Sequence, residues 1–146
     1  MTVLDANVLL YAYNADSPEH VAARARLAGL LASRDWVGLT WLTLWAFLRI
    51  STNPRLFPRP LALHEAFDIV RGLLALPSVV VIQPGARHFD LLERLAVENQ
   101  AGGPLMTDAA LAALAIEHGA VLASTDRDFS RFPGLRWLNP LERNAN

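Results

Sequence analysis

The sequence predicts an α/β fold, a three-layer α/β/α domain around a central, mostly parallel sheet of four to five strands. Two observations lead to this prediction. Short apolar segments that resemble strands alternate with longer segments of helical periodicity, which is the order that builds a parallel sheet with helices on both faces. No linker, repeat or low-complexity segment divides the 146 residues, 53% of which are hydrophobic. Residues 1–146 are therefore expected to form a single domain around a sizeable core.

The first half of the chain contains two predicted strands and three predicted helices. Proline gives the clearest boundaries, because Ser17 followed by Pro18 is typical of a helix start and Asn53 followed by Pro54 ends a helix. The apolar spacing just before Asn53 is helical. The expected elements are strands over residues 2–4 and 37–40 and helices over residues 6–13, 18–33 and 41–51.

The second half continues the alternation after a loop marked by Pro58 and Pro60. Residues 79–82 are a β-branched run, which predicts a fully buried strand. Thr107 is expected to cap a helix that Gly119 ends. The expected elements are helices over residues 61–76, 86–98 and 108–118 and strands over residues 79–82, 121–123 and 135–137.

Four aspartates stand where a predicted strand ends or a predicted helix begins. Asp5 follows the first strand, Asp126 and Asp128 follow the strand over residues 121–123, and Asp108 opens the helix before that strand. Because ligands bind beyond the carboxyl ends of parallel strands, these side chains are expected to share one edge of the sheet. Carboxylates that close repel one another, and Mg²⁺ or Mn²⁺ would compensate them. Taken singly, each aspartate also fits a plain role as a cap or turn residue.

Composition narrows the possible functions. The chain has no cysteine, which excludes disulfides and thiolate metal sites, and all 13 basic residues are arginine, which excludes a catalytic lysine. Its apolar runs are far shorter than the ~20 residues that cross a bilayer, and its first residues lack a basic signal leader. We therefore expect a soluble, cytoplasmic protein. The tryptophans are expected in the core rather than as base-stacking platforms; they are Trp36, Trp41, Trp45 and Trp137.

Four stretches resemble the PIN-domain family, in particular the VapC-type toxins of bacterial toxin–antitoxin pairs. They are LDANVLLYA (4–12), FLRISTNPRLF (47–57), TDAALAALAIEHGAVLASTDRDF (107–129) and RFPGLRWLNPL (131–141). The resemblance implies a Mg²⁺-dependent endoribonuclease, with Mn²⁺ as a substitute ion, that hydrolyses phosphodiesters. It assigns Asp5, Asp108 and Asp126 to the catalytic metal site, with Asp128 as a nearby fourth carboxylate.

The resemblance also implies partners and supporting residues. Asn7 and Thr125 (or Ser124) would be polar supports of the site, and arginines would hold RNA phosphates. The candidate arginines are Arg49 and Arg55, or Arg127. The implied partners are an RNA substrate, a VapB-type antitoxin that occupies the active site and a second copy of the chain, with the apolar surface around residues 41–50 as a candidate dimer interface. No membrane partner is expected.

One departure from the family pattern keeps alternatives open. PIN domains usually carry a glutamate on the helix after the second strand, a few residues before an arginine, but no acidic residue occurs between Asp35 and Glu65 here. The chain could therefore be a degenerate, non-catalytic domain that binds RNA or a partner. A receiver-like or haloacid-dehalogenase-like phosphoryl-transfer domain would also place an aspartate after the first strand, although both normally use a lysine.

Overall fold

The computed structural model describes residues 1–142, and within them five strands form one sheet. Every neighbouring pair in the order β3-β2-β1-β4-β5 is parallel, which confirms the predicted α/β class. The strands are β1 (Thr2–Leu4), β2 (Val37–Leu39), β3 (Val79–Val81), β4 (Val121–Ala123) and β5 (Arg136–Leu138). Because β1 is the central strand and β4 its neighbour, the segments after these two strands emerge side by side.

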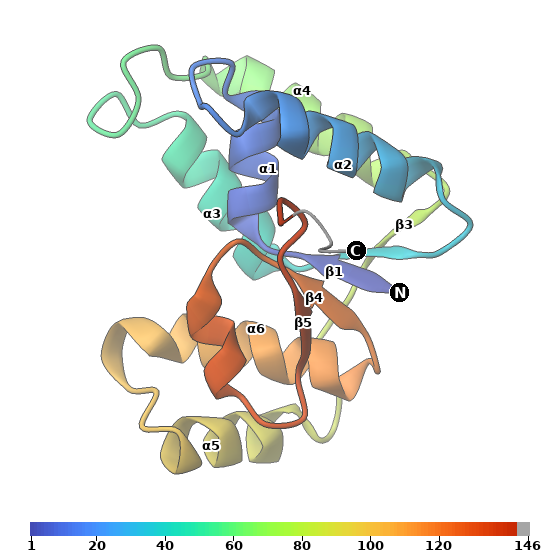
Figure 1. Ribbon diagram of the computed structural model, residues 1–146, viewed down its shortest axis with the longest axis vertical. Helices are drawn as coiled ribbons and strands as arrows, with labels where there is room; N and C mark the ends of the chain where they lie inside the picture. Colours follow the sequence, from blue (N-terminus) through green and yellow to red (C-terminus); the bar gives the residue numbers. More distant parts are fainter. Residues whose placement is uncertain (143–146) are drawn as a thin grey trace.

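Helices cover both faces of the sheet (Figure 1). Helices α1 to α4 gather on one side, and α5 and α6 lie on the other. Successive residues of β1 serve different layers, since Val3 packs into the core beside α6 and Leu4 into the core beside α1 and α3. The helices are α1 (Ala6–Tyr13), α2 (His20–Ala32), α3 (Trp41–Ser51), α4 (Leu63–Leu74), α5 (His88–Glu98) and α6 (Met106–Glu117).

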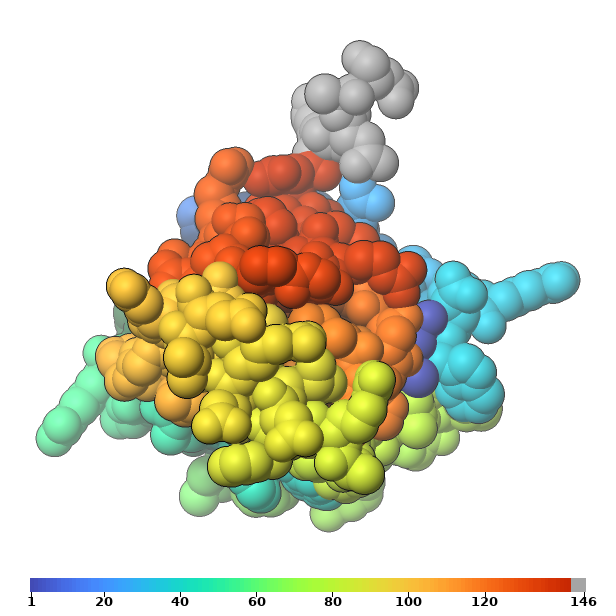
Figure 2. Space-filling model, turned by 90° about the horizontal axis from the view of Figure 1, so that it is seen from below, coloured from blue at the N-terminus to red at the C-terminus, as the bar shows by residue number. Residues whose placement is uncertain are grey.

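Helix α5 is the outermost element below the sheet. Seen from below in Figure 2, α5 (yellow) covers α6 (orange) beside the segment that follows β4 (red). Leu91 and Leu95 of α5 are buried in the same core as Leu111 of α6. The two helices therefore form one packed layer. None of the helices within residues 1–142 has both the length and the apolar character needed to cross a membrane.

Two local predictions were wrong. The strand over residues 79–82 was expected to be fully buried, but β3 is the edge strand and its three residues are only half-buried. Thr107 was expected to cap the next helix, but a 3-10 turn (Gly103–Leu105) leads directly into α6, whose N-cap is Leu105 without a side-chain hydrogen bond. The predicted helix end is confirmed, because Gly119 follows the C-cap residue with a φ of +61°.

The prediction that the tryptophans lie in the core was wrong for Trp36, Trp41 and Trp45, whereas Trp137 packs against the core. Trp36, Trp41 and Trp45 expose 56%, 39% and 62% of their surface, whereas Trp137 is half-buried and donates its Nε1–H to the Ser124 carbonyl at 3.0 Å. The physical reason on α3 is geometric. Its buried face is already occupied by residues such as Phe47, so Trp41 and Trp45 project from the opposite face.

Candidate functional site

The site lies at the edge of the sheet where β1 and β4 end. Leu4 of β1 is paired with Ala123 of β4, and the Asp5 amide donates to the Ala123 carbonyl at 3.0 Å. This pairing brings Asp5 and Ser124, the residues that follow the two strands, next to each other. The predicted meeting of the two strand ends is therefore present in the structure.

Asp5 is fixed in place by three donors. Its Oδ1 accepts a hydrogen bond from the Ala6 amide at 2.7 Å, which caps α1, and its Oδ2 accepts from Ser124 Oγ at 2.7 Å and Asn7 Nδ2 at 3.0 Å. Burial raises the pKa of the Asp5 carboxyl above its ordinary value, although the Ser124 and Ala6 hydrogen bonds oppose the shift and the charge of Asp126 adds to it. Asp5 is thus a largely immobilised carboxylate behind the surface of the site.

Ser124 is the connecting residue of this network. The side chain is fully buried, and its hydroxyl donates to Asp5 while it accepts from Asn7 Nδ2 at 3.1 Å and the Asp126 amide at 3.0 Å. A hydroxyl group has one donor and two acceptor positions, so all three are used. The Thr125 amide donates to Asn7 Oδ1 at 3.3 Å. Of the two hydroxyl residues considered from the sequence, Ser124 carries the side-chain contacts.

Three carboxylates converge near Asp5, whose charge acts on Asp108. One oxygen each from Asp108, Asp126 and Asp128 lies within 4.8 Å of the others. Asp108 comes from the first turn of α6, and Asp126 caps the 3-10 helix η2 (Arg127–Arg131) by accepting the Asp128 amide at 2.8 Å. Asp5 is outside this group of three. The capping role considered for Asp128 in this turn therefore belongs to Asp126, which leaves the Asp128 carboxylate directed to the cluster.

The electrostatics of the cluster appear in the pKa of Asp108. Burial, followed by the charges of Asp126, Asp5 and Asp128, raises this pKa from 3.8 to about 6, while Arg131 opposes the shift. Mutual repulsion among carboxylates of this kind is relieved by a cation that prefers oxygen ligands. The group is therefore suited to a divalent ion.

Arg131 is a site residue that the sequence reasoning missed. Its Nη2 lies 3.4 Å from Asp128 Oδ1, one helical turn earlier. Its Nε is buried and has no hydrogen-bond partner within the described part of the chain. The i,i+3 spacing from Asp128 was the available signal. The positive charge of Arg131 lowers the Asp108 pKa and so opposes the effect of the neighbouring carboxylates.

Helix α3 contributes polar but uncharged groups to this edge. Thr40 caps the helix, and Thr43 Oγ1 donates to the carbonyl of Leu4 at 2.8 Å, one residue before Asp5. Arg49 is exposed in the last turn of α3, and Arg55 is exposed in the following turn. Within residues 1–142 neither arginine forms an ion pair. Both guanidinium groups are thus accessible but are not part of the carboxylate cluster.

Comparisons with known proteins agree with this architecture. The family model of the PIN domain matches residues 2–135. Ribonuclease VapC37 of Mycobacterium tuberculosis is 46% identical over 140 residues, covering 96% of this chain and 97% of the relative. Ribonuclease VapC31 of the same organism is 42% identical over 140 residues, covering 96% of this chain and 99% of the relative. The chain therefore belongs to the PIN-domain family, among its VapC-type members.

Solved structures show the same fold at low sequence identity. M. tuberculosis VapC20, described as a sarcin-ricin loop cleaving toxin, gives a TM-score of 0.68 at 18% identity and covers 93% of this chain and 99% of its own. VapBC2 from Rickettsia felis, bound to a promoter DNA fragment, gives a TM-score of 0.67 at 19% identity and covers 94% of this chain and 97% of its own. Because the chain belongs to the PIN-domain family, it is neither a receiver-like nor a haloacid-dehalogenase-like domain.

Proposed function

We propose that this chain is a metal-dependent endoribonuclease and the toxin of a type II toxin–antitoxin pair. The observation that carries the proposal is the convergence of Asp108, Asp126 and Asp128 near Asp5 at one edge of the sheet. The names of the relatives support RNA as the substrate, since ribonucleases at 40–46% identity align with nearly the whole chain. Hydrolysis of an RNA phosphodiester is the reaction that fits a cluster of this kind.

The donor set fits Mg²⁺ or Mn²⁺, because it consists of carboxylate oxygens whose repulsion raises a pKa. Asp108, Asp126 and Asp128 would hold the ion, and Asp5, whose charge acts on Asp108, would be the fourth carboxylate of the metal site. When bound, the ion would supply a water of lowered pKa and stabilise negative charge on the phosphate. Asp108 must lose its proton to act as a ligand, so ion binding is expected to strengthen as the pH rises through about 6.

The remaining polar residues would position the site and the RNA. Asn7 holds the Asp5 carboxylate and the Thr125 amide in one hydrogen-bonded unit, so it would fix the spacing between β1 and β4. Arg49 and Arg55 are exposed and have no ion-pair partner within residues 1–142. We assign to them contacts with RNA phosphates.

The proposed partners follow from the family. VapBC2 from Rickettsia felis and VapBC from Salmonella typhimurium were solved as DNA-bound structures. We therefore propose a VapB-type antitoxin as a protein partner of this chain. Formation of a homodimer stays a prediction, and light scattering of the isolated protein would test it.

The test of the proposed function is RNA cleavage by the purified chain. Wild type is expected to cut RNA with Mg²⁺ or Mn²⁺ and not with EDTA, while Asp126→Asn is expected to be inactive. Asp35→Asn is the matched control, because it removes the same charge from an exposed position just before β2. A wild-type protein that cuts no RNA and shows no saturable Mn²⁺ binding by calorimetry would support the non-catalytic alternative, which the missing glutamate on α3 keeps open.

A further inference from the structure

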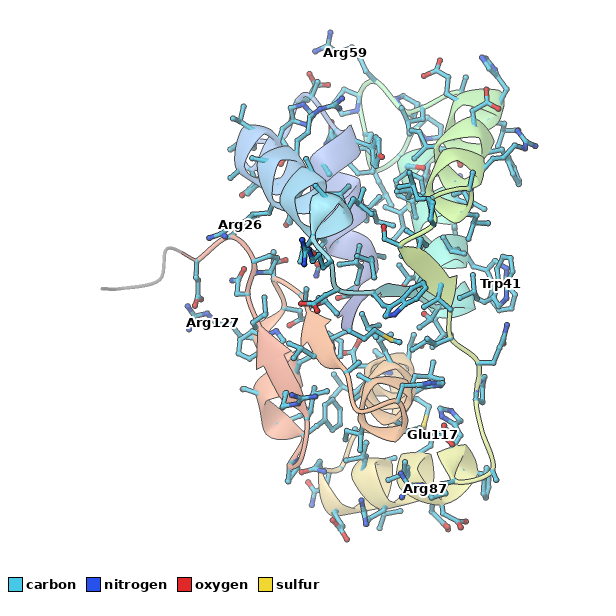
Figure 3. The ribbon with its side chains drawn as sticks, turned by 90° about the vertical axis from the view of Figure 1, so that its right-hand side faces the viewer. Arg26, Trp41, Arg59, Arg87, Glu117 and Arg127 are labelled. Atoms are coloured by element: carbon cyan, nitrogen blue, oxygen red, sulfur yellow. The ribbon has the colours of Figure 1, made fainter. Side chains whose placement is uncertain are left out.

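The outer face of α3 carries two exposed indoles and one guanidinium in a row. Trp41, Trp45 and Arg49 are spaced four residues apart, which places them on one side of the helix. The two rings lie 6.1 Å apart between centroids with an interplanar angle of 31°. Figure 3 shows Trp41 projecting outward from the helix. We call these three residues the α3 stripe.

The stripe begins at the same edge of the sheet as the carboxylates. Strand β2 is preceded by Trp36 and followed by Thr40, the N-cap of α3, so Trp36 and Trp41 lie at opposite ends of one parallel strand. Thr43, in the first turn of α3, donates to the carbonyl of Leu4. Trp41 is thus at the edge where Asp5 emerges, whereas Trp36 is at the far edge.

The chain segment that contains the stripe carries arginines and no acidic residue. Residues 36–64 contain three arginines and no aspartate or glutamate. Arg59 is paired with Asp16, which leaves Arg49 and Arg55 without an ion-pair partner in the part of the chain that the structure describes. A surface that combines exposed aromatic rings with unpaired arginines matches the bases and phosphates of an unpaired nucleic-acid strand.

A second copy of the chain fits this face less well. Pairing of α3 with α3 would offer the two Arg49 guanidinium groups no acidic partner on the helix, because α3 contains no aspartate or glutamate.

From these observations we infer that the α3 stripe is a stacking platform for single-stranded RNA, on which unpaired bases lie against Trp41 and Trp45 while Arg49 contacts a phosphate. The identity of the ligand rests on the proposed function. The stripe would hold the strand that leads to the carboxylate edge, and it would favour unpaired over paired RNA, since bases within a duplex do not offer a free face.

The test measures RNA binding in EDTA, so that cleavage plays no part. The probe is a fluorescein-labelled 12-nucleotide RNA of mixed sequence, and binding is followed by anisotropy. Trp41→Leu and Trp45→Leu are each expected to weaken binding about tenfold, the loss of one stacked base. The matched control Trp36→Leu is expected to stay within twofold of wild type. Trp45→Phe is expected to restore most of the affinity, and a 12-base-pair RNA duplex should bind all variants alike.

Several outcomes would overturn the inference. One is equal RNA affinity for wild type and for the Trp36, Trp41 and Trp45 variants. Another is that Trp45→Leu converts a dimer to a monomer, as seen by light scattering, while its RNA affinity is unchanged. In that case a second copy of the chain, and not RNA, occupies the stripe. Far-UV circular dichroism confirms folding. If Trp41→Leu or Trp45→Leu does not fold, a fluorescence titration takes the place of that variant. RNA is then added to the Trp36→Leu protein, and its tryptophan fluorescence is expected to be quenched. Absence of quenching overturns the inference.

Failure of the inference is distinguishable from failure of the proposed function. A chain that cuts RNA normally but binds it independently of Trp41 and Trp45 removes the stacking platform and leaves the nuclease. A chain that binds RNA through these rings but cuts none with Mg²⁺ or Mn²⁺ removes the nuclease and leaves the platform.

Discussion

Replacing Asp108 with asparagine is expected to stabilise the ion-free protein at neutral pH while it removes ion binding. Asp108 has a folded-state pKa of about 6 against 3.8 for the ordinary group, so the folded protein binds its proton more tightly than the unfolded chain does. The stability that this group contributes is therefore fully present below pH 3.8 and is lost as the pH rises through about 6. Asparagine has nearly the same shape as the protonated aspartic acid and stays neutral at every pH, so the variant keeps this stability when the pH rises.

The expected magnitude follows from the same shift. A pKa raised from 3.8 to about 6 corresponds to about 3 kcal/mol for a fully shielded group. Asp108 is only half-buried and solvent screens its charge, so we expect about half of this, roughly 1.5 kcal/mol. Asp108→Asn should exceed wild type by this amount in free energy of unfolding at pH 7.5 and should match it at pH 3.8.

Urea unfolding followed by far-UV circular dichroism between pH 3.8 and 7.5, in EDTA, measures this difference. Asp35→Asn changes the net charge equally at an exposed position and should follow the wild-type curve. Addition of Mg²⁺ at ten times its Kd should stabilise wild type by about 1.4 kcal/mol and leave Asp108→Asn unchanged. The reasoning is refuted if Asp108→Asn is less stable than wild type at pH 7.5, or if both proteins show the same pH dependence.

Three further predictions concern single residues. Asp126→Asn should weaken Mn²⁺ binding more than tenfold by calorimetry and Asp128→Asn less, because Arg131 already lies 3.4 Å from the Asp128 carboxylate; equal losses would contradict this ranking. Ser124→Ala removes a buried hydroxyl that donates to Asp5, so the free energy of unfolding in urea should fall by about 2 kcal/mol, and an unchanged midpoint would be inconsistent with this role. Gly119→Ala places a side chain at a φ of +61°, and a loss of about 1 kcal/mol should lower Tm by several degrees.

Local sequence patterns predicted most of the fold. The alternation of apolar strands and amphipathic helices gave the parallel sheet, because these periodicities are set by the backbone geometry of each element. The positions of Asp5 and Asp126 at the ends of β1 and β4 could be read directly, since parallel strands end at one edge. The ends of elements were less predictable: α6 begins at Met106 rather than after Thr107, because a turn upstream of it continues into the helix.

The division of roles among the carboxylates depended on the tertiary structure. From the sequence, Asp5 stood with Asp108 and Asp126, and Asp128 was the more doubtful member. The fold brings Asp128 together with Asp108 and Asp126 and holds Asp5 through the Ser124 hydroxyl. The reason is the 3-10 turn after β4, which the Asp126 side chain caps and which turns the Asp128 carboxylate toward α6. The catalytic role of all four residues stays a prediction.

The sequence by itself determined the element order, the parallel sheet and the edge at which the acidic residues gather, because strand and helix periodicities and the residues at strand ends are local properties of the chain. Only the tertiary structure decided which side chains are buried and which oxygens meet. Trp41 and Trp45 are apolar and were expected inside, yet the core side of α3 is filled by Phe47 and its neighbours, so the indoles are exposed. Burial depends on which face of a helix its partners cover, and that is fixed by contacts between elements distant in the sequence.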